Sequence, residues 1–227
     1  MSRFAPHFST FQNAILFRRF DDAVKNPCVC GKPDKMPIYR CKECFLSRPL
    51  CHSCILLSHS QMPFHVIEKW TGMFFMPISP SALGIIVYLG HYGRPCLNNS
   101  VLMKGRDTTV VHTNRIRQYR IEYCHCLGAP AEFVQLTQSG LFPTMLERPE
   151  TAFTFSVLDD FHVHTLTSKK SLWDYYEALV RHTNKAFPHL VLVSISLRFP
   201  NLTIILLLIM PRRGTASFGM CRVSGIT

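Results

Sequence analysis

The sequence predicts an α+β protein that is built from small modules, and three observations predict it. A dense cluster of cysteines and histidines fills residues 28–65. Residues 118–123 alternate polar and apolar side chains, which is the pattern of a half-buried strand. Residues 171–185 carry apolar side chains at helical spacing. We therefore expect a cysteine-rich module first, then a β-rich domain, and an amphipathic helix at the end of that domain.

The cluster offers eight ligand-type side chains at short, regular spacings. They are Cys28, Cys30, Cys41, Cys44, Cys51, Cys54, His59 and His65. Structural zinc takes four cysteine or histidine ligands in a tetrahedron, so eight such residues make two complete sites. Two thiolates that are one or two residues apart can bind one ion from a tight backbone turn at little entropic cost. The spacing therefore predicts two zinc ions in this segment.

The order of the ligand pairs predicts a cross-brace, in which pairs one and three share one ion and pairs two and four share the other. The first ion would be bound by Cys28, Cys30, Cys51 and Cys54, and the second by Cys41, Cys44, His59 and His65. This order resembles B-box zinc modules, although Cys28-x-Cys30 is one residue shorter than the usual first pair. The alternative is a set of disulfides or buried thiols. Disulfides belong to secreted chains and would leave both histidines without a role.

A third zinc site is predicted further along the chain, from residues that are far apart in sequence. The candidate ligands are His91, Cys96, Cys124 and Cys126. The alternating segment 118–123 runs directly into Cys124-His125-Cys126, and the end of a strand is a common place for a metal-binding turn. We expect His125 to point away, with His112 as a spare histidine ligand. The alternative is that Cys96 is a buried thiol and His91 an ordinary loop residue.

The remaining elements follow from local patterns. Residues 1–27 are expected to be a loose lead-in, although an acid-poor start with arginines is also typical of a mitochondrial presequence. Residues 83–89 are apolar and of strand length, and residues 97–109 are expected to be a polar loop. Residues 153–158 predict a strand that leads into a helix. Ser171 and Asp174 form a capping box that starts the amphipathic helix of residues 171–185.

The formal net charge of +11 is spread unevenly, with +5 in residues 1–66, +2 in 67–187 and +4 in 188–227. A basic chain favours nucleic acid or an acidic partner. The last segment contains a nearly continuous apolar run over residues 190–210, but Arg198 and Pro200 interrupt it. A charge inside a membrane span costs about 2.5–3.5 kcal/mol. We therefore consider a membrane anchor the poorer explanation of this tail.

The chain resembles the cysteine-cluster domain of the second C-x-C type that accompanies fungal KDZ (Kyakuja–Dileera–Zisupton) transposases. The resemblance runs from about Cys41 to about Phe187. It rests on short motifs that occur in the same order as in the family, such as Pro63-Phe64-His65, Leu89-Gly90-His91, Arg94-Pro95-Cys96 and Tyr123-Cys124-x-Cys126. It divides the chain into a lead-in (1–27), a B-box-like double zinc module (28–66), the family domain (67–187) and a tail (188–227). The tail departs from the family, which we interpret as intron read-through, a frameshift or a decayed element. The resemblance also implies that Cys124 and Cys126 bind metal.

Full-length members of that family continue into a transposase domain with an RNase H-like fold, which this sequence does not include. We therefore expect a non-catalytic zinc-binding module of a truncated transposase, acting in the nucleus, with no small-molecule substrate. No Gly-rich phosphate loop or nucleophile elbow appears in the sequence. The basic side chains expected to contact DNA are Lys32, Lys35, Arg40 and Lys42. The alternative is a protein-interaction or self-association module of B-box type, with a patch around Phe64, Trp70 and Phe74.

Overall fold

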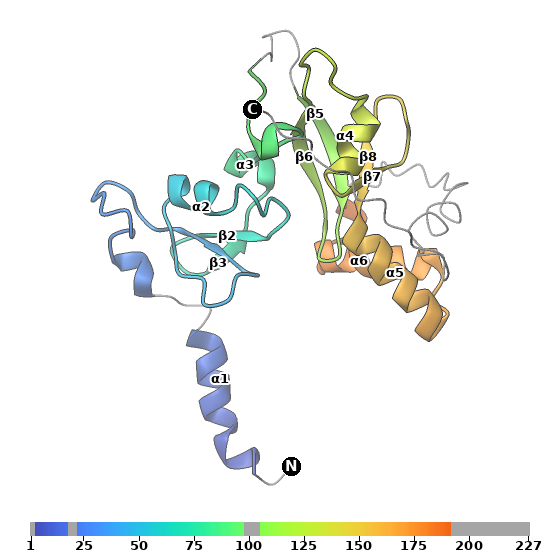
Figure 1. The fold of residues 1–227 in the computed structure, drawn as a ribbon. Coiled ribbons are helices and arrows are strands. Elements are labelled where there is room, and N and C mark those ends of the chain that lie inside the picture. Colours follow the sequence, from blue (N-terminus) through green and yellow to red (C-terminus); the bar gives the residue numbers. More distant parts are fainter. Residues whose placement is uncertain (1–2, 18–21, 98–104, 192–227) are drawn as a thin grey trace, which may run out of the picture.

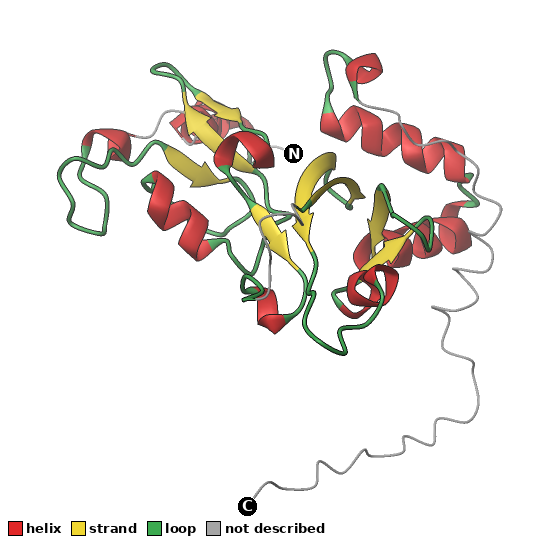
Figure 2. Ribbon diagram, turned by 90° about the horizontal axis from the view of Figure 1, so that it is seen from above, coloured by secondary structure: helices red, strands yellow, loops and turns green. Residues whose placement is uncertain are grey.

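Two separate β-sheets organise the protein (Figure 1, Figure 2). The computed structural model describes residues 3–17, 22–97 and 105–191. The first sheet has three strands and lies within residues 28–77, which we call the first module below, whereas the second has five strands and belongs to the following domain. The mixture of helix and sheet confirms the predicted α+β class.

The first sheet is antiparallel and small. Its strands lie in the order β1 (Tyr39–Cys41), β2 (Ile67–Trp70) and β3 (Phe75–Pro77). Helix α2 (His52–Ser58) packs against it, and a core cluster of Cys41, Ile55, Ile67 and Leu83 fills the space between them. Because this core is so small, we expect the fold of the module to depend on stabilisation beyond apolar burial, such as bound metal. Two of the predicted metal groups lie within it.

The second sheet has the strand order β4-β6-β5-β8-β7 and mixed direction. Its strands are β4 (Ile86–Tyr88), β5 (Arg106–Val111), β6 (Ile116–Glu122), β7 (Leu141–Pro143) and β8 (Thr151–Thr154). The pairs β5–β6 and β7–β8 are antiparallel, while β4–β6 and β5–β8 are parallel. The strand predicted at 118–123 is therefore the long strand β6, which runs to Glu122, next to the metal-binding turn.

Both faces of this sheet are covered. Helices α5 (Phe155–Ser168) and α6 (Leu172–Thr183) pack on one face, in a core that includes Val111 and Phe153. Helix α4 (Glu132–Gln138) packs on the other face, in a core that includes Val110 and Ala152. Consecutive residues of one strand thus enter different cores, as the two-residue period of a strand requires.

The predicted C-terminal helix is confirmed as α6. The Ser171 hydroxyl accepts a hydrogen bond from the Asp174 N–H at 3.1 Å, and Tyr176, Leu179 and Val180 are buried. The strand expected over residues 153–158 is right only at Phe153 and Thr154, where β8 ends. Thr154 caps α5, so residues 155–158 are already helical, although a helix does follow the strand as predicted. Val191 is buried in the same core, four residues beyond Phe187. The domain boundaries at 66/67 and 187/188 stay predictions.

The polar loop expected over residues 97–109 is wrong from Arg106 onwards, because this part forms the central strand β5. Thr108 is fully buried and Thr109 nearly so. Threonine is β-branched, so it suits a strand, and its methyl group can pack in a core. A strand that is buried on both faces shows no alternation, and for that reason the sequence pattern did not reveal it.

The two modules are joined through the tip of the β5–β6 hairpin. The side chain of Asn114 donates hydrogen bonds to the Glu43 carboxylate and, at 3.3 Å, to the Phe64 carbonyl. The Phe64 ring packs edge-on against Tyr119 with a centroid distance of 5.2 Å. A guanidinium of the second sheet, that of Arg117, donates to the Ile78 carbonyl at 2.8 Å. Phe64 therefore fills the junction and is not part of a free contact patch.

One further α-helix of ten residues and several short elements complete the described chain. They are η1 (Ala5–His7), α1 (Phe8–Phe17), η2 (Asp22–Lys25), α3 (Pro80–Leu83), η3 (His91–Gly93) and η4 (Pro188–Leu190). Helix α1, within the predicted lead-in, buries none of its residues and projects from the rest of the molecule (Figure 1). None of the described helices combines the length and apolar character that crossing a membrane requires. The apolar run expected in the tail lies outside the described residues from 192 onwards.

Candidate metal centres

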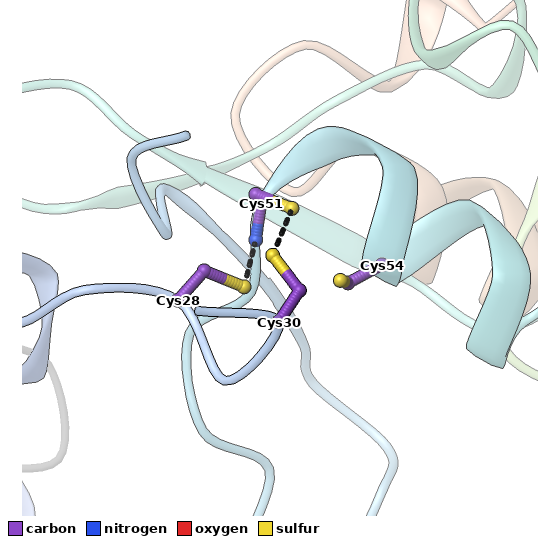
Figure 3. A group of neighbouring side chains, drawn as sticks. All are labelled: Cys28, Cys30, Cys51 and Cys54. Atoms are coloured by element: carbon purple, nitrogen blue, oxygen red, sulfur yellow. Dashed lines mark hydrogen bonds between the residues drawn. The ribbon is translucent and has the colours of Figure 1, made fainter. Parts of the chain in front are cut away.

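The first group contains the four cysteines that the cross-brace assigns to one ion. The sulfurs of Cys28, Cys30, Cys51 and Cys54 lie within 4.8 Å of one another. Figure 3 shows the first pair on a loop and the second pair at the start of α2, with their sulfurs turned toward a common centre. The Cys30 and Cys51 sulfurs are 3.9 Å apart. Two sulfurs on one tetrahedral zinc ion lie about 3.8 Å apart when each Zn–S bond is about 2.3 Å.

Local backbone geometry holds this group in place. Gly31, with φ of +68°, closes the turn after Cys30, and its N–H donates to the Cys28 carbonyl at 2.9 Å. The Cys51 N–H donates to the Cys28 sulfur at 3.2 Å. Cys51 is also the residue that precedes the first turn of α2. The positive end of the helix dipole therefore faces the sulfurs and favours their ionised form.

The thiols of this group differ in acidity. Burial opposes ionisation of Cys51, but hydrogen bonds from the Cys54 N–H and the Ser53 hydroxyl outweigh it, and the pKa of Cys51 falls to about 6. The hydrogen bond with the Cys51 sulfur, together with burial, raises the pKa of Cys54 to about 12. Without a cation, one thiolate thus keeps its neighbour protonated. A divalent ion among the sulfurs would supply the positive charge that the remaining thiolates need.

The second group joins two cysteines to two histidines. Its members are Cys41, Cys44, His59 and His65, whose ligand atoms lie within 4.8 Å of one another. The Cys44 sulfur is 3.4 Å from His59 Nε2 and 3.5 Å from His65 Nδ1, and the Cys41 sulfur is 3.5 Å from His65 Nδ1. A sulfur and a nitrogen on one tetrahedral zinc ion lie about 3.6 Å apart, given bonds of about 2.3 and 2.05 Å. The separations therefore fit zinc.

Hydrogen bonding orients His59, the buried histidine of the second group. His59 Nδ1 lies 3.1 Å from the Ile55 carbonyl, to which it donates, and this bond directs the lone pair of Nε2 toward Cys44. Burial lowers the pKa of His59, so the neutral, metal-binding form is favoured. The Cys44 N–H donates to the Cys41 sulfur at 3.3 Å, and the Cys41 N–H donates to the Ser47 hydroxyl at 3.0 Å.

The third group brings together the four residues predicted from distant parts of the chain. They are His91, Cys96, Cys124 and Cys126, again with ligand atoms within 4.8 Å of one another. His91 Nε2 lies 3.2 Å from the Cys124 sulfur and 3.4 Å from the Cys126 sulfur. The Cys96 sulfur is 3.6 Å from Cys126 and 3.9 Å from Cys124. These distances also fit a tetrahedral ion with one nitrogen and three sulfur ligands.

The backbone at Gly90 lies close to the Cys124 side chain of the third group. A Cβ atom on Gly90 would lie 3.0 Å from Cys124 Cβ, and the φ of Gly90 is +86°. Glycine is therefore required where the His91 turn meets the end of β6. Hydrogen bonds with Cys96 and Cys124 raise the pKa of Cys126 to about 11, as expected for a thiol crowded by other sulfurs without a cation.

Gln135 of α4 holds the strand end that carries Cys124. Its side-chain oxygen accepts from the Cys124 N–H at 2.8 Å, and its amide nitrogen donates to the carbonyls of Cys124 at 3.0 Å and Pro130 at 2.8 Å. Gln135 is 5% exposed. Three backbone groups thus depend on one buried side chain, which acts as a positioning residue for the third group.

Gln135→Ala is therefore expected to destabilise the protein by about 2–4 kcal/mol and to weaken binding of the third ion. Each buried polar group that loses its partner costs about 1–3 kcal/mol, and water can enter to satisfy part of this set. Urea unfolding measures the stability, and competition with a chelator measures the metal affinity. His125→Ala is the matched control, because His125 lies between two ligands but is exposed. Equal loss of the third ion in both variants would contradict the role of Gln135.

The other predicted site residues differ in their placement. His112, the spare ligand, is half-buried and shares a hydrogen bond of 2.9 Å with the Thr154 hydroxyl, so it lies outside the three groups. Lys32, Lys35 and Lys42 are exposed, and the Lys35 ammonium donates to the Ser53 hydroxyl at 2.8 Å. Arg40 differs from the lysines. Its side chain is 14% exposed and pairs with Glu68 at 3.0 Å.

Comparison with protein families identifies part of the chain. Residues 81–186 match the family described as CxC2 like cysteine cluster associated with KDZ transposases. The match includes the five-stranded sheet and the whole third group, and it begins after the first two groups. No curated protein and no solved structure matches the chain. The resemblance expected from the sequence is confirmed over residues 81–186, which match the CxC2-like cysteine cluster associated with KDZ transposases, and the cysteine–histidine clusters that precede this segment fit a zinc module.

Proposed function

We propose that the chain is a non-catalytic, zinc-stabilised accessory module of a KDZ-type transposase, and that it contacts DNA through its first module. The observation that carries the first part is that each of the three metal groups is complete, with four cysteine or histidine ligands. A structural zinc site is closed in this way, whereas a catalytic zinc ion keeps one position open for water or substrate. The ions would therefore stabilise the fold and would not take part in a reaction.

The distribution of charge in the first module supports DNA as the partner. Two of the three acidic side chains in residues 28–77 serve internal contacts: Glu43 accepts from the Val66 N–H and from Asn114, and Glu68 pairs with Arg40. The lysines remain exposed. The exposed lysines of this module are therefore the side chains available to phosphate, and such cations attract it. A nuclear location is the expectation that follows from this role.

Binding to duplex DNA is expected to be weakly sequence-dependent and steeply salt-dependent. Each neutralised phosphate contributes about −0.9 to the slope of log affinity against log salt concentration, so four or five contacts give a slope near about −4. Replacing Lys32, Lys35 and Lys42 together with alanine should flatten this slope by about 2.7, while the zinc content stays unchanged. Fluorescence anisotropy with a labelled duplex, between about 50 and 200 mM salt, measures the effect.

A self-association module is the second candidate, and one observation favours it. The turn between β2 and β3 and the strand after it expose Met73, Phe74 and Met76, at 73%, 49% and 53%. Under this alternative, light scattering should detect a dimer that weakens when Phe74 is changed to serine, and DNA affinity should be absent even at the lowest salt concentration. That result would reject DNA binding but leave the zinc-stabilised module intact.

A further inference from the structure

The loop of residues 42–49 has an apolar tip that no other described residue covers. Phe45 is 91% exposed and Leu46 is 83% exposed. These values are far above those of a phenylalanine or leucine that packs in a core. The tip lies directly after Cys44, a member of the second metal group, so it extends outward from a metal-binding turn.

Hydrogen bonds hold the loop at its base and above the base, so the tip projects from a fixed position. At its base, Tyr39 and Leu50 exchange two backbone hydrogen bonds of 3.0 and 2.6 Å. Above the base, the Cys41 N–H donates to the Ser47 hydroxyl at 3.0 Å, and the Lys42 N–H donates to the Val66 carbonyl at 2.9 Å. A zinc ion on the second group would fix the turn further. An apolar side chain presented in this way loses little conformational entropy when it is inserted into a partner.

The backbone at the tip is strained. Leu46 has a φ of +48°, a left-handed conformation that glycine and asparagine adopt readily and that leucine rarely adopts. Strain of this kind is concentrated at functional sites, because a residue that only had to close a turn could be glycine. The leucine side chain is also not needed for packing, since it is exposed. A leucine that is both strained and exposed points to a contact outside the chain.

The flanks of the tip are basic. Lys42 and Arg48 are exposed on the two sides of Phe45-Leu46. Glu43 is the only acidic residue in the loop, and although it is exposed, its carboxylate is directed to the Val66 N–H, from which it accepts at 3.3 Å, and to Asn114. The loop therefore combines two cations with an apolar wedge between them. Proteins that insert apolar side chains between base steps combine the same two features, an apolar wedge and basic side chains beside it.

We propose that Phe45 and Leu46 insert between two base pairs of duplex DNA and bend it, while Lys42 and Arg48 bind the flanking phosphates. This inference rests on the proposed DNA contact and specifies its geometry. A wedge separates stacked bases, so binding should favour a flexible TA or CA step, at which unstacking costs least. The wedge therefore contributes affinity and bending that depend on apolar contact and add nothing to the salt dependence.

The test compares full-length variants on a duplex that carries 2-aminopurine at a central TA step and fluorophores at its two ends. For wild type we expect a rise in 2-aminopurine fluorescence and closer ends, which report unstacking and bending. Phe45→Ala should weaken binding by about 5- to 160-fold, the range found when one stacking aromatic is removed. It should also abolish both signals and leave the salt slope unchanged. Leu46→Asn, which suits the positive φ, should reduce both signals.

Two further variants keep the result decisive. Phe74→Ala, at another exposed phenylalanine of the same module, should bind and bend DNA as wild type does. Phe45→Trp should retain bending, because tryptophan also stacks on bases. If wild type binds DNA and Phe45→Ala binds and bends it equally well, the wedge is rejected and the phosphate contacts remain. If wild type binds no duplex at the lowest salt concentration, the proposed DNA function fails, and the wedge with it.

Discussion

Removing zinc is expected to abolish the cooperative unfolding transition of the first module. The core of this module is small, and its buried members are Cys41, Ile55, Ile67 and Leu83. We therefore expect the two ions to supply much of the stability that a larger domain gains from apolar burial. Zinc binding contributes about 10–16 kcal/mol to the folding of small zinc peptides. Thermal unfolding followed by circular dichroism, before and after treatment with a chelator, measures the effect.

The stoichiometry provides the second half of this test. Elemental analysis of the purified protein should give three zinc ions per chain, one for each group. Cys51→Ala should lose one ion and the structure of the first module. Cys221→Ala is the matched control, because each of the three groups has four ligands without this cysteine, and all three ions should stay bound. A metal-free protein whose first module still unfolds cooperatively would contradict the organisation described above.

Arg40→Ala is expected to destabilise the protein by about 3–5 kcal/mol. The guanidinium of Arg40 bonds to one carboxylate oxygen of Glu68 through two nitrogens, at 3.0 and 3.1 Å, and lies 3.8 Å from the centre of the Phe75 ring. Both side chains are largely buried, at 14% and 10% exposed. Removing one member of a buried pair leaves the other charge without compensation, and this accounts for the large cost. Urea unfolding of the zinc-loaded protein measures it.

A double substitution tests whether the lost stability comes from the unpaired charge of Glu68. Arg40→Met combined with Glu68→Leu removes both charges, so most of the lost stability should return, because an apolar pair of similar volume often replaces a buried ion pair at little cost. Lys32→Ala, at an exposed lysine, should change the free energy of unfolding by less than about 0.5 kcal/mol. If Arg40→Ala were as mild as Lys32→Ala, Arg40 would belong with the lysines as a surface cation for phosphate.

The metal groups could be predicted from the sequence because each is built mainly from pairs of ligands that are close in the chain. A pair such as Cys51 and Cys54 must lie on one turn in any fold, so only the partnership between pairs was open. The structure brings the pairs together in the predicted combination. Helix α6 was equally predictable, because its cap and its apolar spacing are properties of a continuous segment.

Other features were decided only when distant segments met. The sequence shows Arg40 and Glu68 as ordinary charges, and only the pairing of β1 with β2 places them opposite each other. It shows residues 106–109 as polar, and only the two covering layers make them a buried strand. It shows Gln135 as one polar residue of a helix, although the end of β6 depends on it. Local patterns thus determined which residues could bind metal, whereas burial, a property of the whole fold, determined which charged and polar residues remained available to a partner.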